Sequence, residues 1–257
     1  MRLITWNVAG RVTRQEEQAQ AVAAAAPDVV ALQEVTARTL PLWREALARL
    51  GLCACETALD HPPAQGRRRL GVLTAARDPL ERLAGPDDVP WPERVLACRL
   101  GAIEILNVHS PIAPAPDLAK VRTHEAVAAY LAATAAAGPR ILCGDLNTPR
   151  RELRDGDVLT FAHDSAGRLR PERGERWDRA ERALVHDLRS DGWVDAFRSL
   201  HGYGEREASW TFAHDRGGWR LDHVLVRGPR PLASAYAHDW RRAGLSDHSA
   251  LVVDLQP

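Results

Sequence analysis

Short apolar runs alternate with longer stretches of helical character along the chain. Apolar runs of strand length, bounded by polar residues, are typical of buried strands. Strands are predicted over residues 2–6, 28–33, 52–57, 70–75, 95–100, 103–108, 140–144, 208–212, 219–226 and 249–255. Helices are predicted over residues 13–25, 38–50, 117–138 and about 176–190. This mixture predicts an α/β protein.

Start and stop signals support these helices. Thr13 followed by Glu16 predicts a capping box, and Pro27 follows the end of the same helix. Gly51 is placed to end the second helix, and Asp117 to cap the alanine-rich third one. The chain shows no internal repeat and no low-complexity linker. We therefore expect one domain over residues 1–257, built as a mixed sandwich with helices outside.

Polar side chains stand where five of the predicted strands meet their loops. They are Asn7, Glu34, Asp145 with Asn147, Asp222 with His223, and Asp247 with His248. Residues in such places can converge from distant parts of the sequence onto one cleft. The set offers oxygen, amide and imidazole ligands without a thiolate pair, so it suits Mg²⁺ or Mn²⁺ rather than zinc.

The total charge excludes a protein that is basic all over. The 257 residues include 34 basic and 34 acidic ones, so contacts with a polyanion must come from local charge on one face. The four cysteines form no CxxC pair and no disulfide framework, and we expect buried, reduced thiols. No signal peptide or membrane span is visible, which predicts a cytoplasmic protein, expected to be a monomer.

Each strand-end residue has a chemical and a structural interpretation. Asp145 beside Asn147 can polarise a water and hold it for attack, and Gly144 leaves room for close approach of a ligand. The pair is also typical of an Asx turn that closes a strand. Glu34 would supply the main negative charge of a metal site, with the amide oxygen of Asn7 beside it, or it is simply the first solvated residue after a strand.

His248 follows Asp247 at the start of a predicted strand, where a histidine is often structural. Asp222 stands at another strand end and could hold the imidazole in one tautomer, which raises its basicity. A histidinium that faces a pentavalent phosphorus would stabilise the developing charge.

Six segments together resemble the endonuclease/exonuclease/phosphatase superfamily. They are TWN, LQE, NVHSP, GDLN, LDH and SDH, in this order, and the resemblance that they carry extends over nearly the whole chain. The resemblance implies a four-layer α/β sandwich of two packed mixed sheets flanked by helices. It also implies Mg²⁺-dependent (or Mn²⁺-dependent) hydrolysis of a phosphoester.

The resemblance implies a role for each matching residue. Glu34 is similar to the principal metal ligand, helped by Asn7 and Asp247. The catalytic residues it implies are Asp145 as base or water-orienting carboxylate, Asn147 on the scissile phosphate, and Asp222–His248 as the dyad that stabilises the transition state. His223 is expected to serve in packing.

His109, in NVHSP, departs from the exonuclease III-like branch, which usually has tyrosine there. A histidine at this place resembles the deoxyribonuclease I branch and could protonate the leaving oxygen. In that branch a glutamate supports the histidine, whereas the weak local match here falls among Arg67, Arg68 and Arg69.

The substrate side of the resemblance rests on residues 192–226, which are similar to exonuclease III-like enzymes. Trp210, Phe212 and Trp219 lie there, and residues 210–242 carry six arginines against three acids. This stretch suits backbone contacts and stacking with DNA, or is a strand core with solvated arginines. Arg94 is a further candidate for phosphate contact. Residues 150–182 hold nine arginines and eight acids, which favours a salt-bridged surface over a DNA clamp.

Three functions follow from these observations. The first is a DNA-acting phosphodiesterase of the abasic-site endonuclease or 3′-exonuclease type, which the 192–226 match favours. The second is a hydrolase of a smaller phosphoester, such as a nucleotide, a sugar phosphate or a lipid head group, which the neutral total charge and His109 favour. The third, a non-catalytic binding module, is disfavoured because every matching metal and water-handling residue is present.

Overall fold

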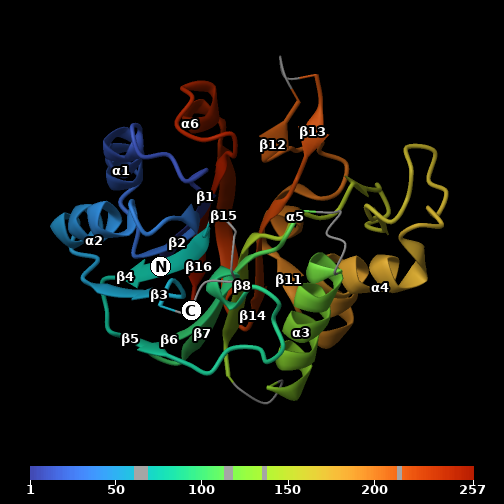
Figure 1. Ribbon diagram of the computed structural model, residues 1–257, viewed down its shortest axis with the longest axis horizontal. Coiled ribbons are helices and arrows are strands. Elements are labelled where there is room, and N and C mark those ends of the chain that lie inside the picture. The colour runs from blue at the N-terminus through green and yellow to red at the C-terminus, as the bar shows by residue number, and fades with distance from the viewer. Residues whose placement is uncertain (61–68, 113–117, 135–137, 213–215) are drawn as a thin grey trace.

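Two mixed β-sheets pack face to face and carry helices on both outer sides, as Figure 1 shows for the computed structural model. The structure describes residues 1–60, 69–112, 118–134, 138–212 and 216–257. The first sheet has the strand order β15 (Arg230–Ala237), β16 (Ala250–Gln256), β1 (Arg2–Asn7), β2 (Val29–Val35), β4 (Gly71–Ala76) and β3 (Ala54–Thr57). The second has the order β11 (Val194–Asp195), β14 (Asp222–Arg227), β8 (Arg140–Asp145), β7 (Ile103–His109), β6 (Val95–Leu100) and β5 (Leu80–Arg82).

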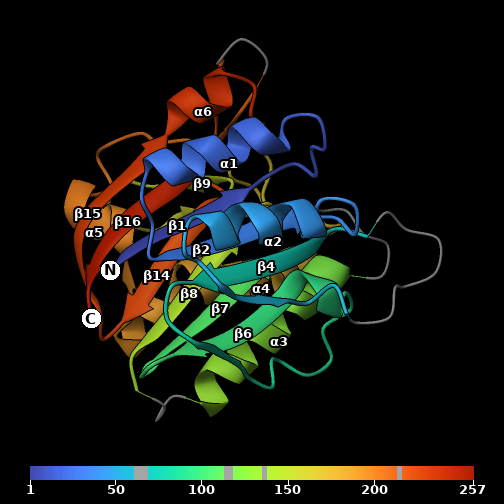
Figure 2. The ribbon, with the colours of Figure 1, turned by 90° about the vertical axis from the view of Figure 1, so that its left-hand side faces the viewer.

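Helices lie on the outer faces of the sheets, except for the short helix of residues 196–201, which packs between β14 of the second sheet and β15 of the first. The helices are α1 (Gln15–Ala24), α2 (Leu40–Arg49), α3 (Ala119–Ala133), α4 (Gly174–Val185), α5 (Ala196–His201) and α6 (His238–Arg242), with short 3₁₀ helices η1 (Pro92–Arg94) and η2 (Asp187–Asp191). Figure 2 shows α1 and α2 across the first sheet, and α3 and α4 lie beyond the second. Two small hairpins are β9 (Arg151–Glu152) with β10 (Val158–Leu159), and β12 (Trp210–Thr211) with β13 (Gly218–Trp219). Within the described ranges, every helix is too short or too polar to cross a membrane.

Neighbouring residues of the central strands face opposite sides, and both sides are buried. Leu3 packs in the cluster between the two sheets, whereas Ile4 packs against α1 and α2. In the second sheet, Ile141 faces the first sheet and Leu142 packs against α3 and α4. A strand that is covered on both faces needs apolar residues at every position, which explains the continuous apolar runs of the sequence.

The predicted sandwich of two mixed sheets flanked by helices is confirmed, and the differences lie at its periphery. The sequence pattern does not predict β15, because this edge strand is largely exposed and has no apolar run. The predicted strand 219–226 is divided, since β13 ends at Trp219 and β14 begins at Asp222. The last part of the predicted helix 176–190 is the 3₁₀ helix η2 rather than a continuation of α4.

The predicted capping box at Thr13 and Glu16 is wrong. Helix α1 begins at Gln15, and no side chain bonds to the free N–H groups of its first turn. The predicted cap at Asp117 lies outside the described residues.

The prediction of four buried thiols holds for two of them. Cys98 and Cys143 are buried in the second sheet, whereas Cys53 is exposed and Cys55 is half-buried. The reason is that β3, which carries Cys55, is the edge strand of the first sheet.

A buried hydrogen-bond network ties the two sheets together. Asn107, on β7 of the second sheet, accepts at Oδ1 a hydrogen bond of 2.8 Å from Nε2 of Gln33, on β2 of the first. The Nδ2 of Asn107 donates to the carbonyl of Leu73 on β4 at 3.0 Å. Both amide side chains are fully buried. Because a buried polar group is costly unless it is bonded, this pair favours a single alignment of the sheets.

Replacement of Asn107 by leucine therefore removes a link that apolar packing cannot restore. We expect Asn107→Leu to lower the free energy of unfolding by about 1–3 kcal/mol, because Gln33 and the Leu73 carbonyl lose their partner in the interior. Urea denaturation measures the change. The matched control is Gln20→Leu on the exposed face of α1, expected within about 0.5 kcal/mol of the wild type. Equal stability of the two variants would contradict the structural role of Asn107.

Candidate active site

Three neighbouring strands of the second sheet place His109, Asp145 and Asp222 in one row. His109, the last residue of β7, is paired in register with Asp145, the last residue of β8. Asp145 is in turn paired with Asp222, the first residue of β14. The three side chains are buried, so two carboxyl groups and an imidazole share the same end of the sheet.

The first sheet contributes Asn7 and Glu34 from the opposite side. Asn7 ends β1, and Glu34 lies where the pairing of β2 with β4 shifts, between Leu32 and Val35. Glu34 has a φ of 59°, a left-handed conformation that is uncommon for residues other than glycine. The Nδ2 of Asn7 donates to Glu34 Oε1 at 3.2 Å and to Asp145 Oδ2 at 3.0 Å. One amide thus joins the carboxylates of the two sheets.

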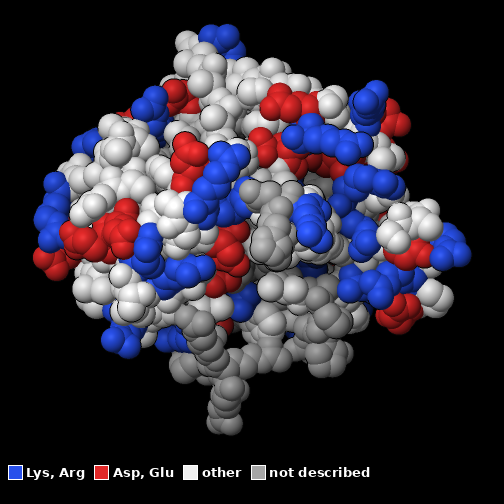
Figure 3. Space-filling model, turned by 90° about the horizontal axis from the view of Figure 1, so that it is seen from above, with Lys and Arg blue, Asp and Glu red and all other residues white. Residues whose placement is uncertain are grey.

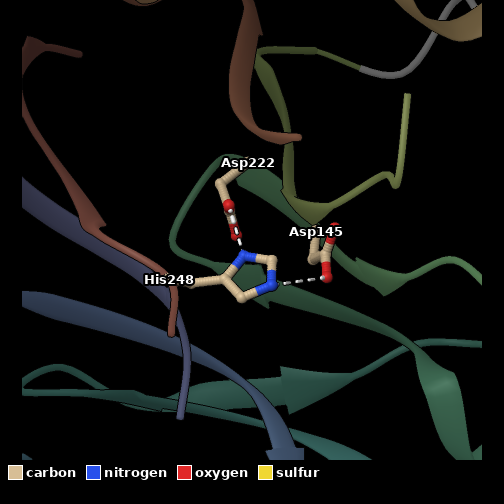
Figure 4. Close-up of side chains that lie close together, drawn as sticks. All are labelled: Asp145, Asp222 and His248. Atoms are coloured by element: carbon tan, nitrogen blue, oxygen red, sulfur yellow. Dashed lines mark hydrogen bonds and ion pairs between the residues drawn. The ribbon is translucent and has the colours of Figure 1, made fainter. Parts of the chain in front are cut away.

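His248 comes from the loop before β16 and stands between Asp222 and Asp145 (Figure 4). Its Nδ1 lies 2.7 Å from Asp222 Oδ2, and its Nε2 lies 3.8 Å from Asp145 Oδ2. Its backbone is also fixed, because its N–H donates to Ser246 Oγ at 3.1 Å and its carbonyl accepts from Trp6 Nε1 at 3.0 Å. The ring therefore has one orientation, with Nε2 turned toward Asp145.

Charge and burial together determine the protonation states of His248 and Asp145. Burial alone would lower the pKa of His248, but the negative charges of Asp222 and Asp145 and the hydrogen bond with Asp222 together raise it to about 10. Burial raises the pKa of Asp145 to about 7; repulsion from Asp222 adds to the rise and His248 opposes it. His248 is therefore an imidazolium at neutral pH, beside a carboxyl group that needs positive charge nearby to stay ionised.

The turn after β8 confirms the Asx-turn interpretation of Asp145 and Asn147, and the chemical interpretation stays a prediction. Asp145 Oδ1 accepts a hydrogen bond of 3.0 Å from the backbone N–H of Asn147, which makes an Asx turn, while Oδ2 faces the site. Asn147 has a φ of 52°, so the chain is not extended there as the alternation of side chains would require. Gly144 also serves differently from the expectation: a Cβ on it would lie 1.9 Å from the carbonyl oxygen of Val108, so glycine permits close packing of β8 on β7.

Two buried cationic or polar groups hold the carbonyls of this turn. Lys120 Nζ donates to the carbonyl of Asn147 at 2.6 Å and pairs with Glu181 at 2.6 Å, with both side chains about 1% exposed. Thr148 Oγ1 donates to the same glutamate at 2.8 Å. His223 Nε2 lies 2.8 Å from the carbonyl oxygen of Thr148, so its expected packing role takes the form of a hydrogen bond to the turn.

Lys120 is a positioning residue that the motif analysis misses, although the composition carries a signal for it. The chain has 34 basic residues, and Lys120 is the only lysine among them. Its ammonium is compact and has three donors, so it bonds to a carbonyl and a carboxylate at once in a fully buried place. The lone lysine of an arginine-rich chain is therefore a residue worth locating in the structure.

A second buried charge cluster supports β14 from behind. Arg220 Nη2 lies 2.6 Å from Glu152 and 2.6 Å from Asp195, and Tyr236 donates to the carbonyl of Asp222 at 2.6 Å. Burial favours the neutral acid, but Arg220 and further hydrogen bonds lower the pKa of Glu152 to about 2. The start of the strand that carries Asp222 is thus fixed by the ion pairs of Arg220 and by the hydrogen bond from Tyr236.

His109 lies within the site but lacks the support found in the histidine-bearing branch. Its Nε2 lies 3.6 Å from Glu34 Oε1 and 3.9 Å from Asp145 Oδ2, and Nδ1 has no hydrogen-bond partner in the described part of the chain. Burial, and then the charge of Arg94, lower its pKa well below 6.5, which favours the neutral ring. Arg67 and Arg68 lie outside the described residues. Protonation of a leaving oxygen by His109 stays a prediction.

The other predicted residues lie at the margin of this site. Asp247 is exposed, and its charge adds to the raised pKa of His248. Arg94 stacks on Trp91 at 4.5 Å and is close enough to influence His109. Their roles in metal and phosphate binding stay predictions.

The two predicted tryptophans form a stacked pair on the hairpin β12–β13. The rings of Trp210 and Trp219 are 5.2 Å apart and nearly parallel, and Phe212 packs edge-on against both. The backbone of Trp210 is paired with His248, which places this aromatic cluster directly beside the dyad. Its contact with a substrate stays a prediction.

The donor set fits a hard divalent cation. Glu34 and Asp145 bring carboxylate oxygens from the two sheets to the same Asn7 amide, and burial of Asp145 without a cation raises its pKa. Asp145, Asp222 and His248 also lie within 4.8 Å of one another, but Asp222 and the Nδ1 of His248 already satisfy each other. The Glu34 side is therefore the better place for a cation, because there a carboxylate and an amide lie together outside the Asp222–His248 pair.

Comparison with known proteins identifies the family. A model of the Endonuclease/Exonuclease/phosphatase family matches residues 4–248. The chain belongs to this family. The family match covers all the segments that converge on the site, from Asn7 to His248.

Individual proteins resemble the chain over nearly its whole length. A DNA-(apurinic or apyrimidinic site) endonuclease of Dictyostelium discoideum is 26% identical over 99% of this chain and 71% of its own length. An AP endonuclease from Archaeoglobus fulgidus, 20% identical, superimposes with a TM-score of 0.74, and a 3′-5′ exonuclease from Neisseria meningitidis, also 20% identical, with 0.71; each comparison covers both chains completely. At these identities the superpositions establish the fold.

Lys120 provides a direct test of how the turn after β8, residues 145–149, is held in place; we call it the catalytic turn because of the role predicted for Asp145. We expect Lys120→Met to lower the free energy of unfolding by about 3–5 kcal/mol, because it leaves Glu181 as a buried charge without its partner. The double variant Lys120→Met/Glu181→Gln removes that charge and should lose less than the sum of the single variants. Urea denaturation of the four proteins completes the cycle. Strict additivity would show that the two side chains do not interact.

The Arg220 cluster predicts a specific acid sensitivity. The folded-state pKa of Glu152 is about 2, below the ordinary 4.5, so its ion pairs stabilise the fold above pH 4.5 and this contribution is lost as the pH falls toward 2. Loss of this contribution lowers the free energy of unfolding by at most about 3 kcal/mol. Unfolding free energies between pH 7 and pH 3 should therefore fall more steeply for the wild type than for Glu152→Gln. Parallel curves for the two proteins would refute this linkage.

Proposed function

We propose that this chain is a divalent-metal-dependent phosphodiesterase that acts on DNA, of the abasic-site endonuclease or 3′-exonuclease type. The observation that carries the proposal is the convergence at one site of the Asp222–His248 pair, the inward-facing oxygen of Asp145 and the Glu34 carboxylate from the other sheet. The imidazolium of His248 suits the negative oxygens of a phosphoryl group. The carboxylates suit a cation and the attacking water on the other side of that group.

Glu34 is the residue that would hold the divalent cation, with Asn7 and Asp247 as the further ligands implied by the family. Asn7 would have to rotate its amide, because its Oδ1 now accepts a hydrogen bond from Ala9 at 2.9 Å. When bound, such a cation stabilises negative charge on phosphoryl oxygens as a Lewis acid. Mg²⁺ and Mn²⁺ both suit oxygen ligands of this kind.

Asp145 is placed to orient the water and accept its proton. One of its oxygens is fixed by the backbone of Asn147, and the other faces the site. The raised pKa of about 7 makes it a competent base near neutral pH. The side-chain amide of Asn147 donates one hydrogen bond to the carbonyl of Ser110 at 2.8 Å, which fixes its orientation, and its second N–H is left to position the phosphate.

His248 is placed to stabilise the charge that develops on the phosphorus oxygens. Asp222 holds its Nδ1, so the proton on Nε2 is presented to the site. The 3.8 Å between this nitrogen and Asp145 is longer than a hydrogen bond, so neither group neutralises the other by direct contact. The aromatic hairpin of Trp210 and Trp219 borders the dyad and would stack against a base or sugar.

DNA is the preferred substrate because of the family members that share this fold along the full chain. The Dictyostelium discoideum relative is an apurinic or apyrimidinic site endonuclease, and the two similar structures are an AP endonuclease and a 3′-5′ exonuclease. A smaller phosphoester is the second candidate, favoured by the zero net charge and by His109 in place of the tyrosine of the exonuclease III-like branch.

A labelled duplex with one abasic site, assayed with Mg²⁺ beside bis-p-nitrophenyl phosphate, decides between these substrates. We expect strand cleavage at the lesion, abolished by EDTA and restored by excess Mg²⁺ or Mn²⁺. Asp145→Asn should reduce the rate at least about 10²-fold, because general-base catalysis contributes about 10²–10⁴-fold. The control variant Asp239→Asn lies on the exposed face of α6 and should cleave at the wild-type rate. Turnover of the small diester without cleavage of DNA would favour the second candidate.

A further inference from the structure

A groove lined by arginines begins beside the catalytic turn and leads away from it. Its volume is about 850 Å³, and eight arginines and three glutamates line it. One end is at Pro149, two residues after Asn147, and Trp219 of the aromatic hairpin forms part of a wall. We call it the arginine groove. Figure 3 looks onto this end of the molecule and shows basic side chains around a hollow.

The three glutamates of the groove cancel only part of this charge. Glu152 is held by Arg198 and Arg220, each at 2.6 Å, and both arginines also line the groove. Glu207 contacts His238 at 3.1 Å, and Glu205 contacts His201 at 3.3 Å. Three glutamates against eight arginines leave a formal excess of five positive charges in the groove.

Four arginines of the groove differ, because they make no ion pair among the residues that the structure describes. They are Arg150, Arg151, Arg154 and Arg206. Three of them follow the catalytic turn directly, and Arg151, Arg154 and Arg206 are exposed. The groove therefore has a local excess of positive charge in a chain whose formal charge is zero.

Most of the other arginines in the same segment are paired. Arg168 pairs with Asp164 at 2.9 Å, Arg170 with Glu172 at 2.8 Å, Arg176 with Glu125 at 2.8 Å and Arg182 with Asp157 at 2.7 Å. Arg173 and Arg179 make no ion pair among the described residues, but Arg173 donates to the carbonyl of Phe161 and packs on the ring of Trp177. The predicted salt-bridged surface of residues 150–182 thus describes most of its distal part, but not Arg150, Arg151 and Arg154.

We propose that the arginine groove binds the sugar-phosphate backbone of the DNA strand on one side of the cleaved phosphodiester. The proposal rests on the proposed function and assigns a specific surface to the flanking nucleotides. The four free charges come from two separate segments, residues 150–154 and Arg206, and four charges suit several phosphates better than a single small anion. Pro149, two residues after Asn147, and Trp219, beside the dyad, both line the groove, so a strand whose phosphodiester reaches Asp145 would lie next to it.

The test compares two triple variants of equal charge. Arg150→Ser/Arg151→Ser/Arg154→Ser removes free arginines of the groove, and Arg168→Ser/Arg170→Ser/Arg176→Ser removes paired arginines from the same segment. We expect the groove variant to raise the KM for an abasic duplex at least about tenfold at 0.1 M salt, with kcat little changed. The slope of log kcat/KM against log salt should become less steep by about 2–3, because each phosphate contact contributes about 0.9. The control variant should match the wild type in both quantities.

Equal KM and salt slope in the two triple variants would overturn the proposal. An effect of the groove variant on a matched RNA duplex and not on DNA would also overturn it, and would assign the groove to RNA. Duplexes extended stepwise on one side of the lesion should gain affinity on the groove side only; an equal gain on both sides contradicts the assignment.

A direct binding measurement separates this proposal from the proposed function. Fluorescence anisotropy measures how tightly a labelled abasic duplex binds to the groove variant and to the control variant, each combined with Asp145→Asn. This measurement does not depend on cleavage. Binding that weakens with the groove substitutions and not with the control supports the groove even if the wild type cuts no DNA. Binding that is unaffected by the groove substitutions rejects the groove even if the wild type cuts DNA well.

Discussion

The hydrogen bonds that Asn107 makes across the interface set how the two sheets meet. Apolar surfaces pack in many registers, but the buried amide of Asn107 finds Gln33 and the Leu73 carbonyl in one alignment. In that alignment the end of β2 faces the end of β8, so Glu34 and Asp145 lie on either side of the Asn7 amide. The way the sheets are joined therefore brings the carboxyl groups of Glu34 and Asp145 close together, and a cation between them would reduce their repulsion.

The site also depends on groups that fix its backbone from behind. Glu34 and Asn147 both adopt left-handed conformations, which are unfavourable for residues with a side chain. The Lys120–Glu181 pair holds the second of them, and the Arg220 cluster holds the strand that carries Asp222. Charged residues around the site thus fall into three groups: buried pairs that hold the backbone, the reactive groups themselves, and the free arginines of the groove.

The sequence predicts the layers and the site better than the details between them. Apolar runs identify the central strands because both of their faces are buried, whereas the exposed edge strand β15 and the short strands near the groove have no such signal. The strand-end motifs predict the convergence of Glu34, Asp145 and His248, and the Asx turn is one of the two interpretations that the sequence supports for Asp145 and Asn147. They do not predict the bulge at Glu34, which depends on pairing with a strand distant in sequence. Two rare residue types also mark buried polar positions. The chain has three asparagines and one lysine, and each of them makes a buried hydrogen bond at or near the site: Asn7, Asn107, Asn147 and Lys120.

The central claim is that a divalent cation at Glu34 and the Asp145–His248 pair enclose one DNA phosphodiester. A crystal structure of the Asp145→Asn protein with Mn²⁺ and an abasic duplex tests it most directly, because manganese is located by its anomalous scattering. The account predicts a manganese peak bound to the Glu34 carboxylate, with the phosphate 5′ or 3′ to the lesion between residue 145 and His248. A manganese ion bound instead by Asp222 and His248, or DNA on a face away from these residues, would contradict it.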